Sequence, residues 1–248
     1  MKAKFSIITV AYNSEKTIER TIQSILGQSF DDYEYIIVDG LSKDDTLGVV
    51  KRYEKDFGDK LKVISEKDNG IYDAMNKGIK AATGEVIGIL NSDDFYEKNA
   101  LEIMNREYEK AVAEGKKHIL LYGMVRLTES GKELGLEMYH HSFLDKQMIH
   151  HPACFVGADV YQDYGLFDSN LKSAADYELM MRLFHKTETC FIPVYEIITN
   201  FERGGMSSNG IGPVETARIK YEYGLVPKSR IMYEKFHAWV VRVYRKIK

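Results

Sequence analysis

Short runs of β-branched and aliphatic residues alternate with amphipathic segments through the first half of the sequence. The runs that suit buried strands cover residues 5–11, 35–39, 61–65 and 85–90. The segments with apolar residues at helical spacing cover residues 18–26, 46–57, 72–82 and 99–114. Because parallel strands need long crossovers, usually helices, this alternation predicts an α/β fold with a mostly parallel sheet flanked by helices.

The second half of the sequence is more mixed. Residues 118–127 and 133–138 are typical of two hairpin strands around a turn at 129–132. A helix is expected over 174–185, and a strand over 190–201 that runs into a glycine-rich segment at 204–212. That segment is either a lid over a ligand or a surface turn. We predict one domain over residues 1–212 and a C-terminal helical extension over 213–248.

Composition bounds the class of protein. The chain has 248 residues, of which 44% are hydrophobic, so it can bury one sizeable core. A net charge of −3 gives no indication of a nucleic-acid partner. The cysteines, Cys154 and Cys190, lack zinc-site spacing and favour a reducing cytoplasm. The apolar N-terminal run is typical of a first strand rather than a signal peptide, and no run reaches the ~18 apolar residues that span a bilayer.

Ligands of open parallel sheets bind at the carboxyl ends of the strands. Residues 11–14, which follow the first predicted strand, contain no glycine triplet. The sequence also lacks a phosphate-cradling GxxxxGK[ST] loop. These absences argue against a dinucleotide-dependent dehydrogenase and against a P-loop ATPase.

Carboxylates stand at two of the predicted strand ends. Asp39 ends the second strand, and Asp93 and Asp94 follow the fourth. Acids crowded at one edge are costly unless a cation or hydrogen-bond donors offset them. A hard divalent ion such as Mg²⁺ or Mn²⁺ would bind such oxygen ligands and a substrate phosphate. The alternative is that these are solvated loop acids, since Asp is common after strands.

Several motifs together match one known family. In the first hundred residues they cover 6–13, 36–40 with 42–46, 66–76 with Gly78, 82–84 and 90–94. By these motifs the sequence resembles the family 2 glycosyltransferases, which have the Rossmann-like GT-A fold. In the second half the matches cover 149–152, 164–168, 175–179 and 200–207. These resemble the members that act in bacterial surface polysaccharide synthesis, and the resemblance extends over residues 4–210.

The resemblance implies where a nucleoside-diphosphate sugar would bind. The residues implied at the nucleoside pocket are Thr9, Ala11, Tyr12, Asn13 and Asp39. The residues implied along the nucleotide-sugar cleft are Asp68, Asn69, Tyr72, Asp73 and Asn76. The Asp-x-Asp position of the family is occupied here by Asn91, Ser92 and Asp93, with Asp94 adjacent. Asp93 is the first candidate for a direct ligand of Mg²⁺ or Mn²⁺, and Asp94 is the second.

Two positions depart from the family pattern. Asn91 stands where the family usually has Asp, which keeps an oxygen ligand but removes a charge. Pro152 stands where Gln commonly follows the family histidine, so an amide contact to the acceptor is lost. The histidine itself corresponds to His151, which either contacts acceptor or phosphate or only packs.

Asp176 matches the catalytic base of the family. A carboxylate within hydrogen-bond reach of the acceptor hydroxyl can remove its proton during sugar transfer. Asp176 opens a predicted helix, where the helix dipole favours the ionised form. From the residues alone, an ordinary acid at a helix start is the alternative.

The segment 226–248 differs in charge from the rest of the chain. It holds seven Lys or Arg and one acid, a net charge of +6, and its apolar residues recur at helical spacing. A basic amphipathic helix can lie on an anionic membrane, here the inner face of the plasma membrane, where a lipid-linked acceptor would be found. The alternative is a helix packed on the domain with a solvated basic face.

The sequence thus predicts transfer of a sugar from a UDP- or GDP-sugar to a saccharide or lipid-linked saccharide, and the resemblance implies inversion at the anomeric carbon. A sugar nucleotidyltransferase is a second reading, although the glycine-rich basic loop usual in such enzymes is missing. A catalytically degenerate sugar-nucleotide-binding subunit is a third, motivated by Asn91 and Pro152.

Overall fold

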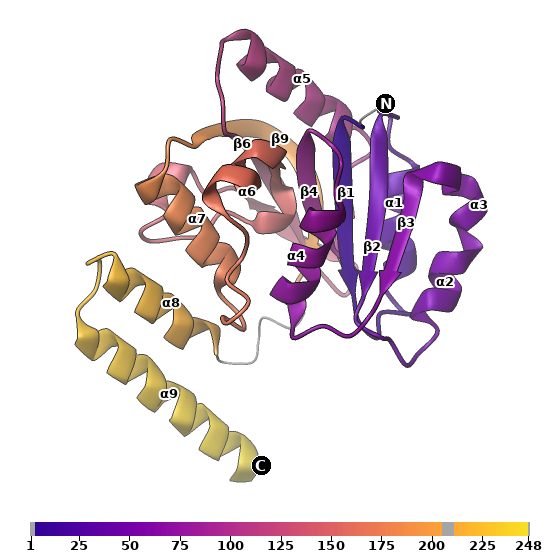
Figure 1. The fold of residues 1–248 in the computed structure, drawn as a ribbon. Helices are drawn as coiled ribbons and strands as arrows, with labels where there is room; N and C mark the ends of the chain where they lie inside the picture. Colours follow the sequence, from indigo (N-terminus) through magenta and orange to yellow (C-terminus); the bar gives the residue numbers. More distant parts are fainter. Residues whose placement is uncertain (1–2, 205–210, 248) are drawn as a thin grey trace.

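The computed structural model describes residues 3–204 and 211–247 of the chain. The predicted lid or turn at 204–212 therefore lies largely outside the described residues. Within them, the strands form one nine-stranded mixed sheet in the order β3-β2-β1-β4-β8-β6-β9-β5, with β7 paired to β6. Helices cover both faces of this sheet (Figure 1).

The first half forms the predicted parallel unit. Its strands are β1 (Phe5–Ala11), β2 (Tyr33–Asp39), β3 (Leu61–Ser65) and β4 (Val86–Asn91), and all their mutual pairings are parallel. Its helices are α1 (Ile18–Leu26), α2 (Thr46–Arg52), α3 (Glu54–Phe57), α4 (Ile71–Ala81) and α5 (Ala100–Ala113). The helix predicted over 46–57 is thus split at Tyr53 into α2 and α3, followed by the 3₁₀ turn η1 (Gly58–Lys60).

The second half completes the sheet with mixed pairing. The hairpin is confirmed as β6 (Ile119–Glu129) and β7 (Lys132–Glu137), and β9 (Cys190–Glu202) runs parallel to β6. The short strands β5 (Phe95–Tyr96) and β8 (Cys154–Gly157) are both antiparallel to their neighbours. Because β8 runs against β4, its N-terminal end lies at the same sheet edge as the carboxyl end of β4. That edge also receives the 3₁₀ turn η3 (His151–Ala153), which packs against β4.

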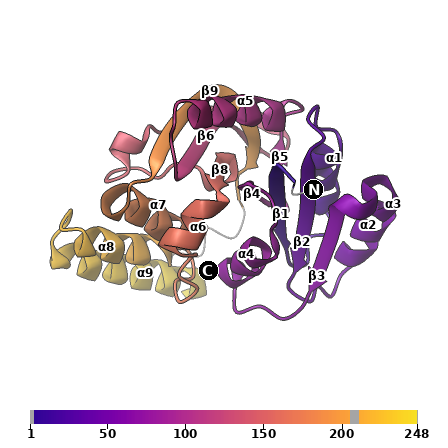
Figure 2. The ribbon, with the colours of Figure 1, turned by 45° about the horizontal axis from the view of Figure 1, so that its top comes forward.

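Alternate residues of the central strands bury into two cores. On β1, Ile7 faces one core with the buried side of α1 and α5, and Ile8 faces the other with α4. The second core also takes in α6 (Ala158–Tyr164) and α7 (Ala175–Lys186). Figures 1 and 2 show α4 and α6 on one face of the sheet and α1 on the other. Helices therefore pack on both faces of the sheet, so a ligand can reach it only at the ends of the strands.

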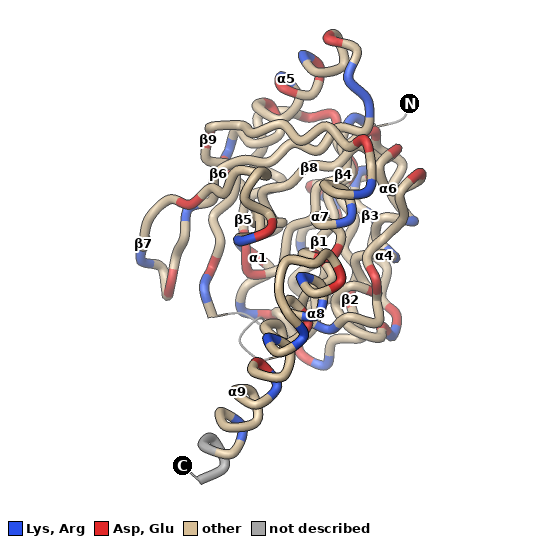
Figure 3. The backbone as a smooth tube through the Cα atoms, turned by 90° about the vertical axis from the view of Figure 1, so that its left-hand side faces the viewer, with Lys and Arg blue, Asp and Glu red and all other residues tan. Residues whose placement is uncertain are grey.

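Among the described residues, two helices follow β9. The first, α8 (Gly212–Glu222), packs on the domain, where the buried carboxylate of Glu215 accepts hydrogen bonds from the backbone of Lys172 at 2.9 Å and Ser173 at 2.8 Å. The second, α9 (Lys228–Ile247), confirms the predicted C-terminal helix and extends away from the body of the protein (Figure 3). The domain boundary at 212 stays a prediction. Among the described residues, no helix is both long enough and apolar enough to cross a membrane.

Candidate functional site

A pocket of about 310 Å³ opens at the carboxyl ends of β1 and β2. It is lined by Tyr12, Gly40, Leu41, Lys43, Lys67 and Asp68. A Cβ atom at Gly40 would stand 2.3 Å from Asp68 Oδ2, so only glycine at this position lets Asp68 approach so closely. Of the residues predicted for the nucleoside pocket and the sugar cleft, Tyr12 and Asp68 line this space.

The other residues predicted at the nucleoside pocket lie beneath or beside it. Thr9 and Ala11 are buried in β1, and Thr9 Oγ1 accepts a hydrogen bond from the Tyr35 hydroxyl at 3.0 Å. Asp39 is fully buried and accepts from Ser65 Oγ at 2.7 Å, which ties the end of β2 to the end of β3. Asn13 Oδ1 accepts from the backbone N–H of Lys43 at 2.8 Å. Asp39 and Asn13 therefore shape the loops around the pocket.

The residues predicted along the sugar cleft surround the start of α4. Asp73 Oδ2 accepts from the backbone N–H of Asn69 at 2.9 Å, and this bond holds the preceding loop on the helix. Asn76 lies deeper, at 7% exposure, and its amide makes hydrogen bonds of 2.9 and 3.1 Å with the backbone of Phe167. The structure thus places Asn76 at the junction between α4 and the 167 loop, away from the pocket.

The turn after β4 carries the Asp-x-Asp-like motif. Ser92 Oγ lies 2.8 Å from Ser14 Oγ, which links this turn to the loop after β1. Asn91 Nδ2 donates to Asp94 Oδ2 at 3.0 Å, and Asp94 Oδ1 accepts from the backbone N–H of Glu202 at 3.0 Å. Asp94 is 1% exposed, whereas Asp93 is only partly buried. The two adjacent acids therefore occupy different environments.

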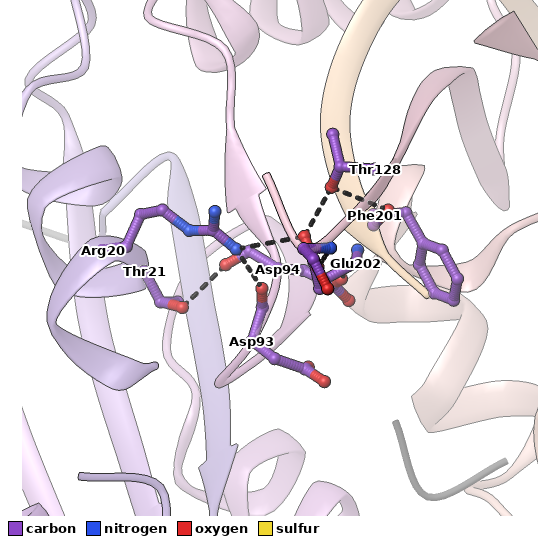
Figure 4. Close-up of polar contacts among 8 residues, drawn as sticks. Arg20, Thr21, Asp93, Asp94, Thr128, Phe201 and Glu202 are labelled. Atoms are coloured by element: carbon purple, nitrogen blue, oxygen red, sulfur yellow. Dashed lines mark hydrogen bonds and ion pairs between the residues drawn. The ribbon is translucent and has the colours of Figure 1, made fainter. Parts of the chain in front are cut away.

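Side chains from α1 hold the backbone of the same turn (Figure 4). Arg20 donates to the carbonyl oxygen of Asp93 at 3.0 Å, and Thr21 Oγ1 donates to that of Asp94 at 2.7 Å. Arg20 also pairs with Glu202 Oε2 at 3.6 Å. The Asp93 carboxylate points away from Arg20 in this view. The turn is thus anchored through its carbonyl groups, which leaves the Asp93 side chain available.

Burial and like charge set the ionisation of this cluster. Burial, together with the charge of Asp93, raises the pKa of Asp94 from its ordinary value of 3.8 to about 7. Burial, with the charge of Glu202 acting in the same direction, raises the pKa of Asp93. Burial also disfavours the ionised form of Glu202, but hydrogen bonds from Thr128 and Ser130 outweigh it and lower its pKa. A cation at this edge would stabilise both aspartates in their ionised forms.

The candidate base lies beside the candidate histidine. Asp176 Oδ1 accepts from the Tyr72 hydroxyl at 3.0 Å, and Asp176 Oδ2 lies 3.5 Å from His151 Nδ1. Burial, with the charge of Asp176 and the bond to it, raises the pKa of Tyr72, so its hydroxyl stays a donor. His150 points elsewhere, since its Nε2 lies 3.0 Å from Glu137 Oε2. His150 is the N-cap residue of the 3₁₀ turn η3, and His151 is its first residue.

The donor atoms near the Asp93–Asp94 turn fit a hard or borderline divalent cation. Asn91 Oδ1 and His151 Nε2 are both buried, and neither has a hydrogen-bond partner among the described residues. Within the described part of the chain, no three His, Cys, Asp or Glu side chains form a ready-made ligand set. The protein would therefore supply few ligands, and the phosphates of a substrate and water would supply the rest, as is usual for Mg²⁺.

Sequence reasoning did not assign roles to Arg20, Thr21 and Glu202. Glu202 stands within the motif at 200–207, which was the one available signal for it. The sequence around Arg20 and Thr21 contains no signal for their roles, because their hydrogen-bond partners lie 73 residues further along the chain. Tyr72 was expected in the sugar cleft, and the structure also connects it to Asp176.

Comparisons with known proteins find glycosyltransferases. The family described as "Glycosyl transferase family 2" matches residues 6–115. A "PGL/p-HBAD biosynthesis glycosyltransferase" of Mycobacterium tuberculosis is 27% identical over 208 residues, which cover 84% of this chain and 80% of the relative. An uncharacterized glycosyltransferase of Rickettsia prowazekii is 29% identical over 198 residues, covering 75% and 60% of the two chains.

Solved structures share the fold. S. aureus TarS 1-349 in complex with UDP-GlcNAc superposes with a TM-score of 0.71 at 22% identity, covering 93% of this chain and 69% of that one. Against a longer TarS structure, the chain spans 41% of that protein's length. A mannosyltransferase of Pyrobaculum calidifontis in complex with GDP-Man and Mn²⁺ has a TM-score of 0.65 at 15% identity, covering 96% and 70% of the two chains. Residues 6–115 therefore match the family 2 glycosyltransferases, and the chain has the GT-A fold of the solved glycosyltransferases that it resembles.

Proposed function

We propose that the chain transfers a sugar from a nucleoside diphosphate to a hydroxyl of a saccharide or lipid-linked saccharide, with inversion at the anomeric carbon. One observation carries this proposal. The pocket at Tyr12 and Asp68, the Asp93–Asp94 turn and the His151–Asp176 pair all gather at one end of the sheet. The resemblance of the second half supports a place in cytoplasmic steps of cell-surface polysaccharide synthesis.

The donor would bind with its nucleoside in the pocket. Tyr12 is 53% exposed and offers a ring face to a base, and Asp68 offers an acceptor oxygen. The exposed Lys43 and Lys67 supply positive charge beside the diphosphate. UDP-GlcNAc and GDP-Man are the ligands of two similar structures, which supports a nucleoside-diphosphate sugar as the donor class.

The acceptor hydroxyl would lose its proton to Asp176. Oδ1 of this carboxylate is occupied by the Tyr72 hydroxyl and by the backbone N–H of Tyr177, at 3.0 and 2.9 Å. Oδ2 is therefore the oxygen that takes the proton, and the nearby His151 ring helps to fix its direction. Attack on the face opposite the diphosphate then inverts the anomeric centre.

We propose Mg²⁺ or Mn²⁺ as the cofactor, with Asp93 as the first ligand. When bound, this ion would neutralise the charge that develops on the diphosphate leaving group. Asp94 and Asn91 would hold the turn through the hydrogen bond between them. Asn91 Oδ1 takes no part in this bond and has no partner among the described residues.

Turnover of UDP-, GDP- and dTDP-sugars with Mn²⁺ or Mg²⁺ tests the proposal, with release of nucleoside diphosphate as the readout. Asp176→Asn should lower kcat at least about 100-fold, since a positioned base contributes 10²–10⁴-fold. Donor binding by calorimetry should persist. Glu178→Gln is the matched control, because Glu178 lies on the same helix and pairs with Arg182 at 3.0 Å. Full activity of Asp176→Asn would remove the base assignment.

Two other outcomes would redirect the proposal. Donor binding without turnover on any acceptor or water would favour a catalytically degenerate subunit, the reading motivated by Asn91 and Pro152. Release of pyrophosphate from a nucleoside triphosphate and a sugar phosphate would favour a nucleotidyltransferase.

A further inference from the structure

The helix α9 uses one face to contact the rest of the protein. Ile231, Ala238 and Val241 are partly buried, and Glu234 is 8% exposed. These residues recur at three- and four-residue spacing, so they share a face, and α8 lies alongside (Figure 1). Glu234 is paired with Arg230 at 2.5 Å and lines the groove between the two helices. This packing uses only part of the apolar surface of α9.

A second apolar face of α9 is open to solvent. Its members are between 41% and 68% exposed and comprise Met232, Tyr233, Phe236, Trp239 and Val240. Phe236 and Trp239 stack with their ring centroids 6.0 Å apart, one turn of the helix from each other. Soluble monomers seldom present so many large apolar side chains on one strip without a partner. Four residues of the apolar stripe predicted from the sequence, Met232, Phe236, Trp239 and Val240, are therefore exposed.

Cationic residues border this exposed face. Lys228, Lys235 and Arg242 are exposed and recur every seven residues, so they form a row along one side of the stripe. Arg230 and His237 lie on the other side. Glu234, the one acid of the helix, is turned away and buried. Blue positions therefore dominate the projecting helix in Figure 3.

From this arrangement we infer that α9 lies on an anionic lipid surface, with Trp239 and Phe236 inserted at the headgroup boundary. An apolar strip with aromatic residues, bordered by lysine and arginine, is the pattern that binds in the plane of a bilayer. A second copy of the chain is a poorer occupant, because pairing two such faces would bring their cationic rows together. The inference does not depend on the proposed function.

The position of α9 suits this role. In Figure 1 it projects toward the end of the molecule at which the strands β1–β3 terminate. A bilayer against α9 would therefore lie on the side of the protein that carries the candidate site. A hydroxyl on a lipid-linked acceptor could then reach the cleft without leaving the membrane.

Vesicle binding by the full chain tests the inference. Trp239 is the only tryptophan, so its emission reports on this face alone. With phosphatidylglycerol-containing vesicles we expect a blue shift and co-sedimentation, both reduced by salt. With pure phosphatidylcholine vesicles we expect much weaker binding. If the wild-type chain shows neither a blue shift nor co-sedimentation with the anionic vesicles, the inference is wrong.

Matched variants separate the two parts of the surface. Lys235→Gln with Arg242→Gln should weaken binding about 30-fold, since each surface cation contributes about 1 kcal/mol. Lys62→Gln with Lys117→Gln, exposed lysines elsewhere, should leave binding within about twofold. Met232→Gln with Phe236→Gln should abolish the blue shift, and Leu134→Gln with Leu136→Gln on β7 should not.

Nucleotide-sugar turnover in solution separates this inference from the proposed function. All four variants should keep the wild-type rate, because none touches the candidate site. If the wild-type chain binds the vesicles but turns over no nucleotide sugar, the proposed function is wrong and the membrane inference stands. A concentration-dependent dimer that buries Trp239, with no vesicle binding, would replace the membrane by a second copy of the chain.

Discussion

The buried carboxylate of Asp94 gives the sharpest prediction from the structure. Asp94→Asn keeps the shape of the side chain, and its Oδ1 can still accept from the backbone N–H of Glu202. The new amide would meet Asn91 Nδ2, but rotation of the Asn91 amide would turn its partnerless oxygen toward the added donor. We therefore expect the variant to fold with every hydrogen bond of this cluster preserved.

The magnitude follows from the ionisation of Asp94. Its pKa is about 7 in the folded chain, against an ordinary value of 3.8, so the folded state holds a proton that the unfolded state has lost. The free energy of unfolding should therefore fall as pH rises from about 4 to 7, by about 1.4 kcal/mol per pH unit. Asn cannot titrate. Between pH 5 and pH 8, the free energy of unfolding of the variant should therefore rise by about 3 kcal/mol relative to that of the wild type.

Urea unfolding in EDTA at pH 5, 6, 7 and 8 measures this difference. Asp59→Asn, which removes an exposed acid on η1, is the control and should change the free energy of unfolding little at any of these pH values. Wild type and Asp94→Asn with parallel pH profiles would refute the reasoning. A difference that shrinks as pH rises would show instead that the ionised carboxylate is stabilised by its hydrogen bonds.

Two further predictions concern the pocket and the candidate base. Tyr72→Phe removes the hydroxyl that donates to Asp176 at 3.0 Å, and hydrogen bonds to charged groups contribute about 1.5–3 kcal/mol, so kcat should fall at least about 10-fold while the KM for the donor changes little. An unchanged kcat would show that Tyr72 only packs, with its ring stacked on that of Phe167 at a centroid distance of 5.8 Å. Gly40→Ala places a Cβ 2.3 Å from Asp68 Oδ2, so calorimetry should show donor affinity at least about 10-fold lower with unchanged circular dichroism. Wild-type affinity would show that the contact between Gly40 and Asp68 is dispensable.

The parts of the fold that the sequence predicted are those with a local signal. β1 and β2 are uninterrupted runs of residues that favour strands, and both are buried on their two faces. The strands β5 and β8 have two and four residues, too few to show any period. The helical extension predicted over 213–248 consists of two helices, and its first helix, α8, begins at Gly212–Pro213 and buries Glu215, a residue that sequence patterns assign to solvent.

The same distinction applies to the candidate site. The sheet topology brings the acids at the ends of β2 and β4 to one edge, and the alternation of strands and helices predicted as much. The hydrogen-bond partners of the acids in the candidate site, Asp176 included, come from distant segments of the chain. Tyr72 and Asp176 lie 104 residues apart, and Asp94 and Glu202 lie 108 apart. No local pattern encodes such pairs, so only the resemblance indicated Asp176.

The structure also explains why two adjacent aspartates would have different tasks. Asp94 is buried, and its two oxygens are bound by Asn91 and by the backbone of Glu202. In the part of the chain that the structure describes, no other residue donates a hydrogen bond to the Asp93 carboxylate. Arg20 grips Asp93 through its carbonyl oxygen only, which fixes the backbone without neutralising the side chain at close range. Asp94 thus anchors the turn to β9, and this anchoring leaves Asp93 as the carboxylate that can face a ligand.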